Sequence, residues 1–280
     1  MKIEELLKFG KEKLEQYKID DASIISRILI QYVLKIDRNY LIINKDNEVV
    51  INKENEYKKH IEEIIKGKPI QYITNNQEFM KLNFYVDENV LIPQPDTEIL
   101  VEEVIKNINV KENIKILDMC TGSGCIGISL AKYIENAKVT LVDISKKAIE
   151  IAKKNSIQNN VEDKLEFIQS DMFENIREEF DIIVSNPPYI KTDIIQTLDK
   201  QVQSEPHIAL DGGQDGLYFY KVLINQAPKY LKDTGRLFLE IGYDQKQEIE
   251  SLARSNGKYK KIEIIKDLSQ NDRVVILSKK

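Results

Sequence analysis

The chain has 280 residues, of which 42% are hydrophobic and 31% charged, and its formal net charge is −5 at pH 7. These values are typical of a globular protein with one large domain or two modest ones, and they disfavour a broad phosphate-binding surface. The two cysteines form no C-x-x-C pair and there are only two histidines, so we expect no metal site. Because no signal-peptide core or membrane-length apolar run is present, we expect a cytoplasmic protein with no membrane partner.

The first quarter of the chain is predicted to be helical. Apolar residues recur at roughly helical spacing in three segments, residues 3–17, 21–36 and 52–68. The third segment ends at Gly67, and Pro69 follows closely, which is typical of a helix stop. We therefore predict a helical domain over residues 1–72. Because such a bundle docks a partner or packs on a neighbour more often than it carries chemistry, we expect it to dock the substrate.

The pattern changes after this helical part. Residues 80–87, MKLNFYVD, alternate in polarity and indicate a strand or hairpin, so residues 73–96 are predicted to form a β-hairpin linker. From residue 97 to residue 280, short apolar strands alternate with helical segments of about ten to fifteen residues. This alternation predicts an α/β domain with a mostly parallel sheet. The last two strands follow each other across a polar turn, which indicates an antiparallel hairpin at the sheet edge.

Acidic residues end three consecutive predicted strands. The strand IKILD ends at Asp118 and runs into MCTGSGCIG, where Gly122 and Gly124 let the backbone approach a ligand and begin a helix. The next strand ends at Asp143, where a carboxylate can accept hydrogen bonds from ribose hydroxyls. The third ends near Asp171, which can accept from the exocyclic amine of an adenine. Because the carboxyl ends of parallel strands share one sheet edge, this row predicts a nucleoside-bearing cofactor.

The glycine-rich turn resembles the D-x-G-x-G-x-G motif of the class I S-adenosylmethionine-dependent methyltransferases, which have a Rossmann-like fold. The order in this chain is Asp118-x-Cys120-x-Gly122-x-Gly124, so Cys120 replaces the first glycine. A cysteine at this position must adopt a backbone conformation that glycine tolerates, but its small side chain need not block the ligand. The resemblance implies a class I methyltransferase fold for residues 97–280, preceded by the small helical bundle.

The fourth strand, FDIIVS, leads Asn186-Pro187-Pro188-Tyr189 to the same edge. This sequence resembles the (N/D)-P-P-(Y/F/W) motif of enzymes that methylate planar amide or exocyclic nitrogens. The lone pair of such a nitrogen is delocalised, so Asn186 and the Pro187 carbonyl are expected to accept its two hydrogens and turn the lone pair toward the methyl group. The prolines fix the backbone and offer no competing N–H. Tyr189 is expected to stack on the flat substrate group, and no strong general base is required.

Motifs along nearly the whole chain distinguish among the enzymes with this strand end. LIPQPDTEILVE, from Leu91 to Glu102, is similar to the L-I-P-R-P-[DE]-T-E segment of the peptide chain release factor glutamine methyltransferases, the HemK/PrmC family, with Gln94 in place of arginine. Further similarities are GKPIQYI at 67–73, Glu78-Phe79, EPHIALDGGQDGL at 205–217, FLEIG at 238–242 and DLSQNDRVV at 267–275. Within the last segment, Gln270 occupies a position that is often glycine.

This resemblance implies methyl transfer from S-adenosylmethionine, without a metal, to the side-chain nitrogen (N5) of the glutamine in the Gly-Gly-Gln (GGQ) tip of class I release factors. S-adenosylhomocysteine is then the product, the release factor is the expected protein partner, and no direct contact with nucleic acid is expected. The family's cofactor contacts fall on Cys120, Thr121, Gly122, Ser123, Gly124, Asp143, Asp171, Met172 and Asn186. Its substrate contacts fall on Asn186, Pro187, Pro188 and Tyr189, and the catalytic set is Asn186, Pro187 and Tyr189.

The residues by themselves leave other functions open. A ribosomal protein glutamine methyltransferase shares the N-P-P-Y motif, but its linker lacks the P-D-T-E run. A DNA or RNA base methyltransferase should show basic clusters or an added recognition domain, and this acidic chain shows neither clearly. A catalytically silent S-adenosylmethionine-binding module is disfavoured by Asn186 and Tyr189. The chain also has its own GGQ ending at Gln214, but the family pattern varies at that place, so self-methylation is not expected.

Overall fold

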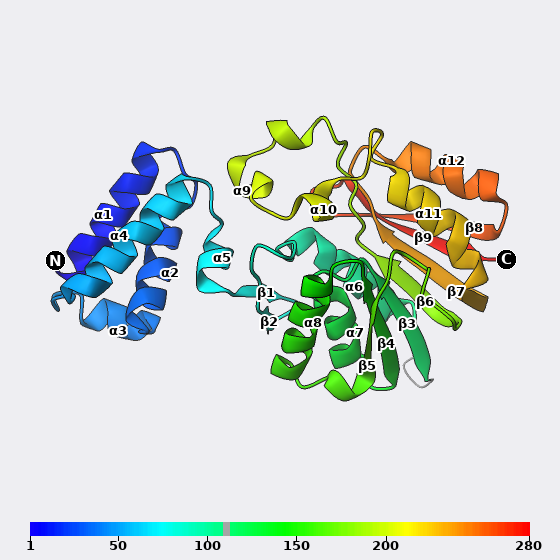
Figure 1. Cartoon of the computed structure of the whole chain (residues 1–280), viewed down its shortest axis with the longest axis horizontal. Helices are drawn as coiled ribbons and strands as arrows, with labels where there is room; N and C mark the ends of the chain where they lie inside the picture. Colours follow the sequence, from blue (N-terminus) through cyan, green and yellow to red (C-terminus); the bar gives the residue numbers. More distant parts are fainter. Residues whose placement is uncertain (109–112) are drawn as a thin grey trace. The chain divides into compact units, whose positions relative to one another are not determined.

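The computed structural model describes residues 1–108 and 113–280 (Figure 1). These residues divide into two compact units. The first contains Met1–Asn75 together with Asp199–Ser204, and the second contains Asn76–Leu198 and Glu205–Lys280. No helix in the described ranges is both long and apolar enough to cross a membrane. The sequence did not predict that residues 199–204 group with the helical unit.

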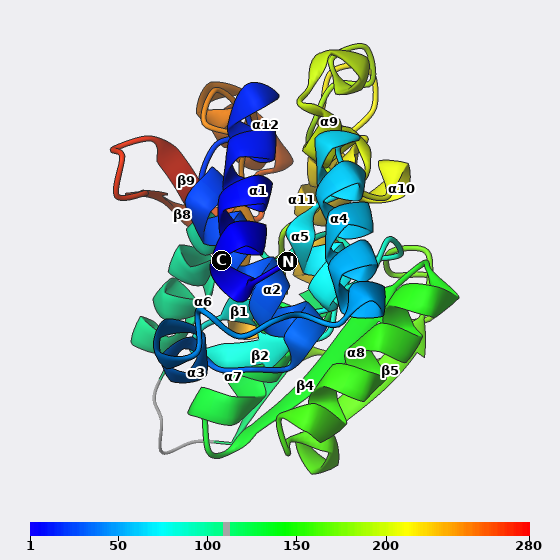
Figure 2. The ribbon, with the colours of Figure 1, turned by 90° about the vertical axis from the view of Figure 1, so that its left-hand side faces the viewer.

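The first unit is made of helices. They are α1 (Ile3–Gln16), α2 (Ala22–Leu34), α3 (Arg38–Ile43), α4 (Ile51–Ile65), α5 (Ile70–Thr74) and the short α9 (Lys200–Gln203). Helices α1, α2 and α4 pack side by side around one apolar core, as the two views agree (Figures 1 and 2). The Tyr57 hydroxyl of α4 lies in this core, 2.8 Å from Ser26 Oγ of α2. Gly10 of α1 gives this tyrosine its space, because a Cβ there would lie 1.9 Å from the Tyr57 oxygen.

The second unit begins with a hairpin of β1 (Gln77–Phe79) and β2 (Leu82–Phe84). Its turn residues Met80 and Lys81 have φ values of 50° and 58°, the left-handed region that two-residue hairpin turns need. Asn155 of α8 (Lys146–Gln158) holds the chain just after the hairpin, since it accepts from the Tyr85 N–H and donates to the Tyr85 carbonyl. The linker is therefore anchored on the second unit by a buried side-chain amide.

The core of the second unit is a seven-stranded sheet in the order β5-β4-β3-β6-β7-β9-β8. The parallel strands are β3 (Ile114–Met119), β4 (Ala137–Asp143), β5 (Leu165–Gln169), β6 (Phe180–Ser185) and β7 (Leu231–Glu240). The strands β8 (Tyr259–Lys266) and β9 (Asp272–Lys279) pair antiparallel at the end of the sheet. The predicted mostly parallel sheet with a C-terminal antiparallel hairpin is confirmed. Its chain order reverses between β3 and β6, where open α/β sheets bind their ligands.

Helices cover both faces of this sheet (Figure 1). One apolar cluster joins the sheet to α6 (Pro95–Lys106), α7 (Cys125–Tyr133) and the hairpin. The other joins it to α11 (Tyr218–Gln226) and α12 (Lys246–Asn256). The remaining short helices are α10 (His207–Leu210), η1 (Glu162–Lys164), η2 (Ile195–Thr197) and η3 (Ala227–Lys229). This two-sided burial explains the continuous apolar runs of the central strands.

Candidate active site

A cavity lies at the carboxyl ends of the parallel strands in the second unit, with about 950 Å³ of space free of atoms, part of which is open to solvent. Its wall comes from the segments that follow β3, β4, β5 and β6, together with residues 89–91 of the linker and the start of α11. The sequence-predicted residues in this wall are Cys120, Gly122, Asp143, Asp171, Met172, Asn186 and Pro188. These predicted residues come from four separate segments and meet at one site, at the sheet edge where the acidic row was expected.

Asp118 has a different place from the other two acids. Strand β3 continues through Asp118 to Met119, and the Asp118 carboxyl is fully buried outside the cavity wall. Its Oδ2 accepts from Thr121 Oγ1 at 2.5 Å and from the Gly127 N–H at 2.9 Å. Burial raises the pKa of Asp118 to about 7, against the lowering effect of these two donors. The expectation that Asp118 ends its strand in the acidic row was wrong. The buried Asp118 carboxyl stabilises the turn through its hydrogen bonds with Thr121 and Gly127.

The turn after β3 presents Cys120 and Gly122 to the cavity. Cys120 adopts a φ of 62°, the left-handed conformation that glycine tolerates best, and its Sγ lies 4.0 Å from Met172 Sδ. Gly122 has a φ of 54°, and a Cβ added there would meet no atom within 4 Å. This face of the turn is therefore open enough for a ligand to approach the backbone.

Three other predicted turn residues lie behind this face. Thr121 and Ser123 are buried, and the wall of the cavity includes neither of them nor Gly124. A Cβ at Gly124 would lie 2.8 Å from Ile128 and 3.1 Å from Ala152, so this glycine lets α7 and α8 approach each other. Their role as direct cofactor contacts stays a prediction.

The acids after β4 and β5 differ in exposure. Asp143 is partly buried, and its two oxygens accept from the N–H groups of Gly122 and Ser145, each at 2.9 Å. Burial raises the pKa of Asp143, while these backbone donors lower it. Each oxygen keeps a second lone pair for a ligand. Asp171 is exposed at the rim, two residues beyond the end of β5, and Met172 beside it is buried in the wall.

The N-P-P-Y segment follows directly from β6. Asn186 is partly buried, and its Nδ2 donates to the Thr97 hydroxyl of α6 at 3.2 Å. Its Oδ1 therefore remains available as an acceptor. Pro187 and Pro188 are buried, and Tyr189 is partly buried with its pKa raised, mainly by burial. Thr97 lies within the IPQPDTE motif, but its contact with Asn186 was not predicted from the sequence.

The G-G-Q-D-G loop supports the backbone of the N-P-P-Y segment. The Gly212 N–H donates to the Ile190 carbonyl at 2.8 Å, and a Cβ on Gly212 would lie 2.7 Å from the Tyr189 Cα. Gln245 donates from Nε2 to the carbonyls of Tyr189 and Gly216, at 3.0 and 3.2 Å. These close approaches explain the glycines of the motif. Gln214 is exposed and does not belong to the cavity wall.

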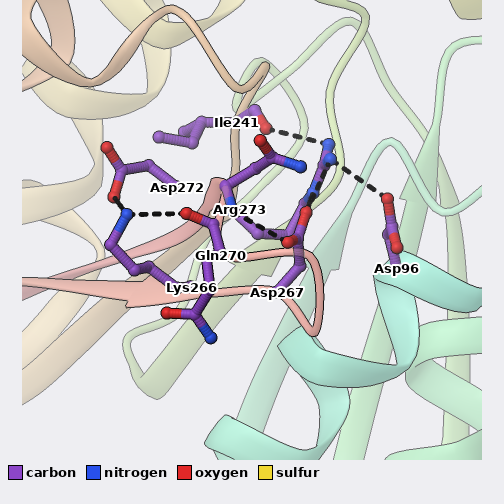
Figure 3. A network of polar contacts seen from close by, with 8 residues as sticks. Asp96, Ile241, Lys266, Asp267, Gln270, Asp272 and Arg273 are labelled. Atoms are coloured by element: carbon purple, nitrogen blue, oxygen red, sulfur yellow. Dashed lines mark hydrogen bonds and ion pairs between the residues drawn. The ribbon is translucent and has the colours of Figure 1, made fainter.

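A second polar cluster links the last motif to the start of α6 (Figure 3). Arg273 Nη2 pairs with Asp267 Oδ2 at 3.1 Å and with Asp96 Oδ2 at 3.0 Å, while its Nη1 donates to the Ile241 carbonyl at 3.4 Å. Gln270 has a φ of 67°, which explains why glycine suits its position. The departure at Gln94 has a local effect, because its side chain donates back to the Ile92 carbonyl at 2.9 Å.

The strand order of the sheet is that of the class I methyltransferases. The glycine turn after β3 and the N-P-P-Y segment after β6 meet at one cavity, which defines a methyltransferase of this fold. Family models agree: the Methyltransferase small domain matches residues 94–204, and the PrmC N-terminal domain matches residues 5–74. The chain is 43% identical to the release factor glutamine methyltransferase of Clostridium acetobutylicum, over 95% of this chain and 93% of that protein. It is 40% identical to the enzyme of the same name from Clostridium botulinum, over 98% of each chain. The chain belongs to the release factor glutamine methyltransferase family.

A solved structure supports the fold independently. The 16S rRNA N2 G1207 methyltransferase of T. thermophilus, solved in complex with AdoMet and guanosine, has a TM-score of 0.54 to this chain at 19% identity. The match covers 73% of this chain and 50% of that one. At this identity the likeness bears on the fold alone.

Proposed function

We propose that this protein transfers the methyl group of S-adenosylmethionine to the side-chain nitrogen of the glutamine in the GGQ motif of class I release factors. The observation that carries the proposal is the Asn186 amide, whose nitrogen donates to Thr97 at the edge of the cavity and whose oxygen remains free to accept. Membership of the release factor glutamine methyltransferase family supports the choice of a glutamine over a nucleic-acid base.

The cavity fits the proposed donor. Its wall is mostly apolar and includes Val90, Val142, Ile144 and Met172, which suits the two faces of an adenine ring. Asp143 at the end of β4 offers lone pairs to ribose hydroxyls, and the open face of Gly122 leaves room beside the turn. When bound, S-adenosylmethionine supplies an electrophilic methyl group on a sulfonium.

The residues of β6 and its extension hold the acceptor. Asn186 Oδ1 and the Pro187 carbonyl accept the two N–H hydrogens of the substrate amide, which directs the nitrogen lone pair toward the cavity. Tyr189 covers the flat face of the amide. Because burial raises the pKa of the Tyr189 phenol, this ring is neutral at physiological pH and adds no charge beside the reacting nitrogen. The substrate nitrogen would take the methyl group as the methyl–sulfur bond of the donor breaks to leave S-adenosylhomocysteine, and it would release one N–H proton to solvent as the N–C bond forms, so a strong general base is unnecessary.

The helical unit is proposed to dock the release factor in the cytoplasm. Its own core is complete, with Tyr57 and Leu29 among its fully buried side chains, so it needs no catalytic role to account for its fold. Docking by the helical unit would supply binding energy from parts of the release factor other than the reacting amide.

Labelling with a tritiated methyl donor tests the proposal. Purified enzyme is incubated with tritiated S-adenosylmethionine and a class I release factor, and we expect label in the GGQ-containing peptide. The control acceptor is the same release factor with its GGQ glutamine changed to alanine, which should take up no label. Ribosomal protein and DNA are parallel acceptors, and label in either of them in place of the release factor would contradict the proposal.

A further inference from the structure

We propose that Glu240 and Thr97 are positioning residues for methyl transfer, which act by fixing the direction of the Asn186 amide. The inference rests on the proposed function, because it assigns a role within the same site. An asparagine amide can turn over to exchange its oxygen and nitrogen, and only one of the two orientations presents an acceptor to the substrate. The structure provides the groups that select this orientation.

The contacts form a chain from Asn186 into the core. Asn186 Nδ2 donates to Thr97 Oγ1, so the hydroxyl acts as an acceptor there and keeps its own hydrogen to donate. The Glu240 carboxyl lies near the Thr97 hydroxyl and the Asn186 amide, since both groups lower the Glu240 pKa. A carboxylate accepts hydrogen bonds but does not donate them. In its ionised form, Glu240 therefore favours the orientation in which the Asn186 nitrogen points inward and the oxygen points away.

Three separate elements meet at this point. Glu240 is the last residue of β7, Thr97 lies in the first turn of α6, and Asn186 follows β6. The backbone beside Glu240 is tied on two sides, since Tyr220 Oη donates to the Glu240 carbonyl at 2.9 Å and the Ile241 N–H donates to the Arg273 carbonyl at 2.9 Å. The backbone that carries the carboxyl is thus held in place before any ligand binds.

A structural role alone does not account for this glutamate. Its side chain is 2% exposed, and its Oε2 has no hydrogen-bond partner among the described residues. Burial raises the pKa of Glu240 to about 7, in spite of the opposing effect of Thr97 and Arg273. A buried carboxyl with an unpartnered oxygen costs stability, and an apolar residue of similar volume would avoid that cost. Retaining a costly group beside a reactive amide is expected where the group serves the reaction.

Charged groups face Glu240 from several elements. Arg273 on β9 lowers the Glu240 pKa, and Asp96 at the start of α6, which pairs with Arg273, raises it. The Tyr189 hydroxyl also faces the Glu240 carboxyl, which raises the Tyr189 pKa. Figure 3 shows Arg273 between Asp96 and Asp267, so its charge is shared by two acids and is only partly available to Glu240. The neutral polar groups that face the carboxyl are therefore Thr97, Asn186 and Tyr189.

The decisive experiment compares Thr97→Val with Thr97→Ser in the full chain. Valine keeps the shape and removes the hydroxyl, whereas serine keeps the hydroxyl. With tritiated donor and release factor, we expect Thr97→Val and Glu240→Gln to lower kcat about 10- to 100-fold, with the KM for the donor changed less than about twofold, and Thr97→Ser to retain most of the activity. Thr140→Val removes another buried threonine hydroxyl, in β4, and as the matched control should keep the kcat of the unaltered chain.

A second measurement does not depend on turnover. The side-chain amide of Asn186, identified in a ¹⁵N-labelled sample by its loss in Asn186→Ala, should exchange slowly with solvent in the unaltered chain and fast in Thr97→Val. Full activity of Thr97→Val, equal losses in Thr97→Val and Thr97→Ser, or an unchanged amide signal would overturn the inference. If the unaltered chain labels no release factor, the proposed function fails, and the amide signal still decides whether Thr97 and Glu240 fix Asn186.

Discussion

At the scale of single residues, the site depends on the polar atoms that can still bind a ligand after other atoms of the same side chains have formed hydrogen bonds within the protein. The Asn186 side-chain nitrogen donates a hydrogen bond to Thr97, and its oxygen remains available as an acceptor. Asp143 gives each oxygen one backbone donor and keeps further lone pairs. Both side chains are therefore held in place by the protein and still able to bind a ligand, which is the condition for a preorganised site.

Removal of the Asn186 amide is predicted to separate binding from turnover. Asn186→Ala takes away the acceptor for the substrate N–H, and we expect methylation of release factor to fall below detection. Donor affinity should change little, because the apolar wall and Asp143 remain. Turnover is measured by tritium transfer and donor affinity by calorimetry. Retained turnover would show that another group holds the substrate amide.

Removal of the Asp143 carboxylate is predicted to have the opposite result. Asp143→Ala leaves ribose hydroxyls and the Gly122 N–H without their acceptor, so we expect donor binding to weaken by about 1–3 kcal/mol. Asp143→Asn keeps one acceptor oxygen and should lose less. Asp233→Ala, at a fully exposed aspartate in β7, serves as the control. Equal calorimetric affinities for Asp143→Ala and the control would remove Asp143 from the site.

At the scale of elements, loops approach the N-P-P-Y segment so closely that glycine is required. Gly216 and Gly257 both adopt left-handed φ values, 72° and 71°. A Cβ on Gly216 would lie 2.5 Å from the Tyr189 carbonyl oxygen, whereas one on Gly257, at the end of α12, would meet nothing within 4 Å. An alanine would therefore be strained by the φ value at either position, but only at position 216 would its Cβ clash with a neighbouring atom.

This pair gives a controlled prediction for the loop. Gly257→Ala should cost roughly 1 kcal/mol of folding stability through its φ value and leave kcat unchanged. Gly216→Ala should also displace Tyr189, and we expect a loss of kcat of at least about tenfold. Urea unfolding measures the first effect and tritium transfer the second. The same kcat in both variants would mean that the loop yields without moving the N-P-P-Y segment.

Much of the arrangement of elements could be predicted because it rests on local patterns. The alternation of apolar strands with helical segments predicted the sheet and its antiparallel end, and the strand ends placed Asp143 and Asn186 on one edge. Contacts between distant segments could not be predicted in this way. Thr97 and Asn186 are 89 residues apart along the chain, and no periodicity specifies their contact. The role of Asp118 was missed because a strand pattern does not show on which residue the strand ends.

At the scale of the whole molecule, the described part of the second unit contains three carboxyls whose burial raises their pKa values to about 7. They are Asp118, Glu205 and Glu240. Each group binds a proton more readily in the folded chain than in the unfolded one. Stability from these groups is therefore fully present below their unfolded pKa values, near 4 to 4.5, and is lost as the pH rises through about 7. The folded chain is expected to lose stability between about pH 4 and pH 7.

Glu205 offers the clearest test of this pH dependence, because it has a single strong partner, the Ile92 N–H, which donates to its Oε2 at 2.8 Å. Glu205→Gln keeps an oxygen that can accept this hydrogen bond and removes the titration. We expect the variant to be more stable than the unaltered chain at pH 8 by up to about 3 kcal/mol, and close to it at pH 5. Urea unfolding at both pH values measures the difference. A stability difference that is the same at pH 5 and pH 8 would show that the Glu205 carboxyl titrates alike in the folded and unfolded chains, and that its burial does not penalise the ionised form.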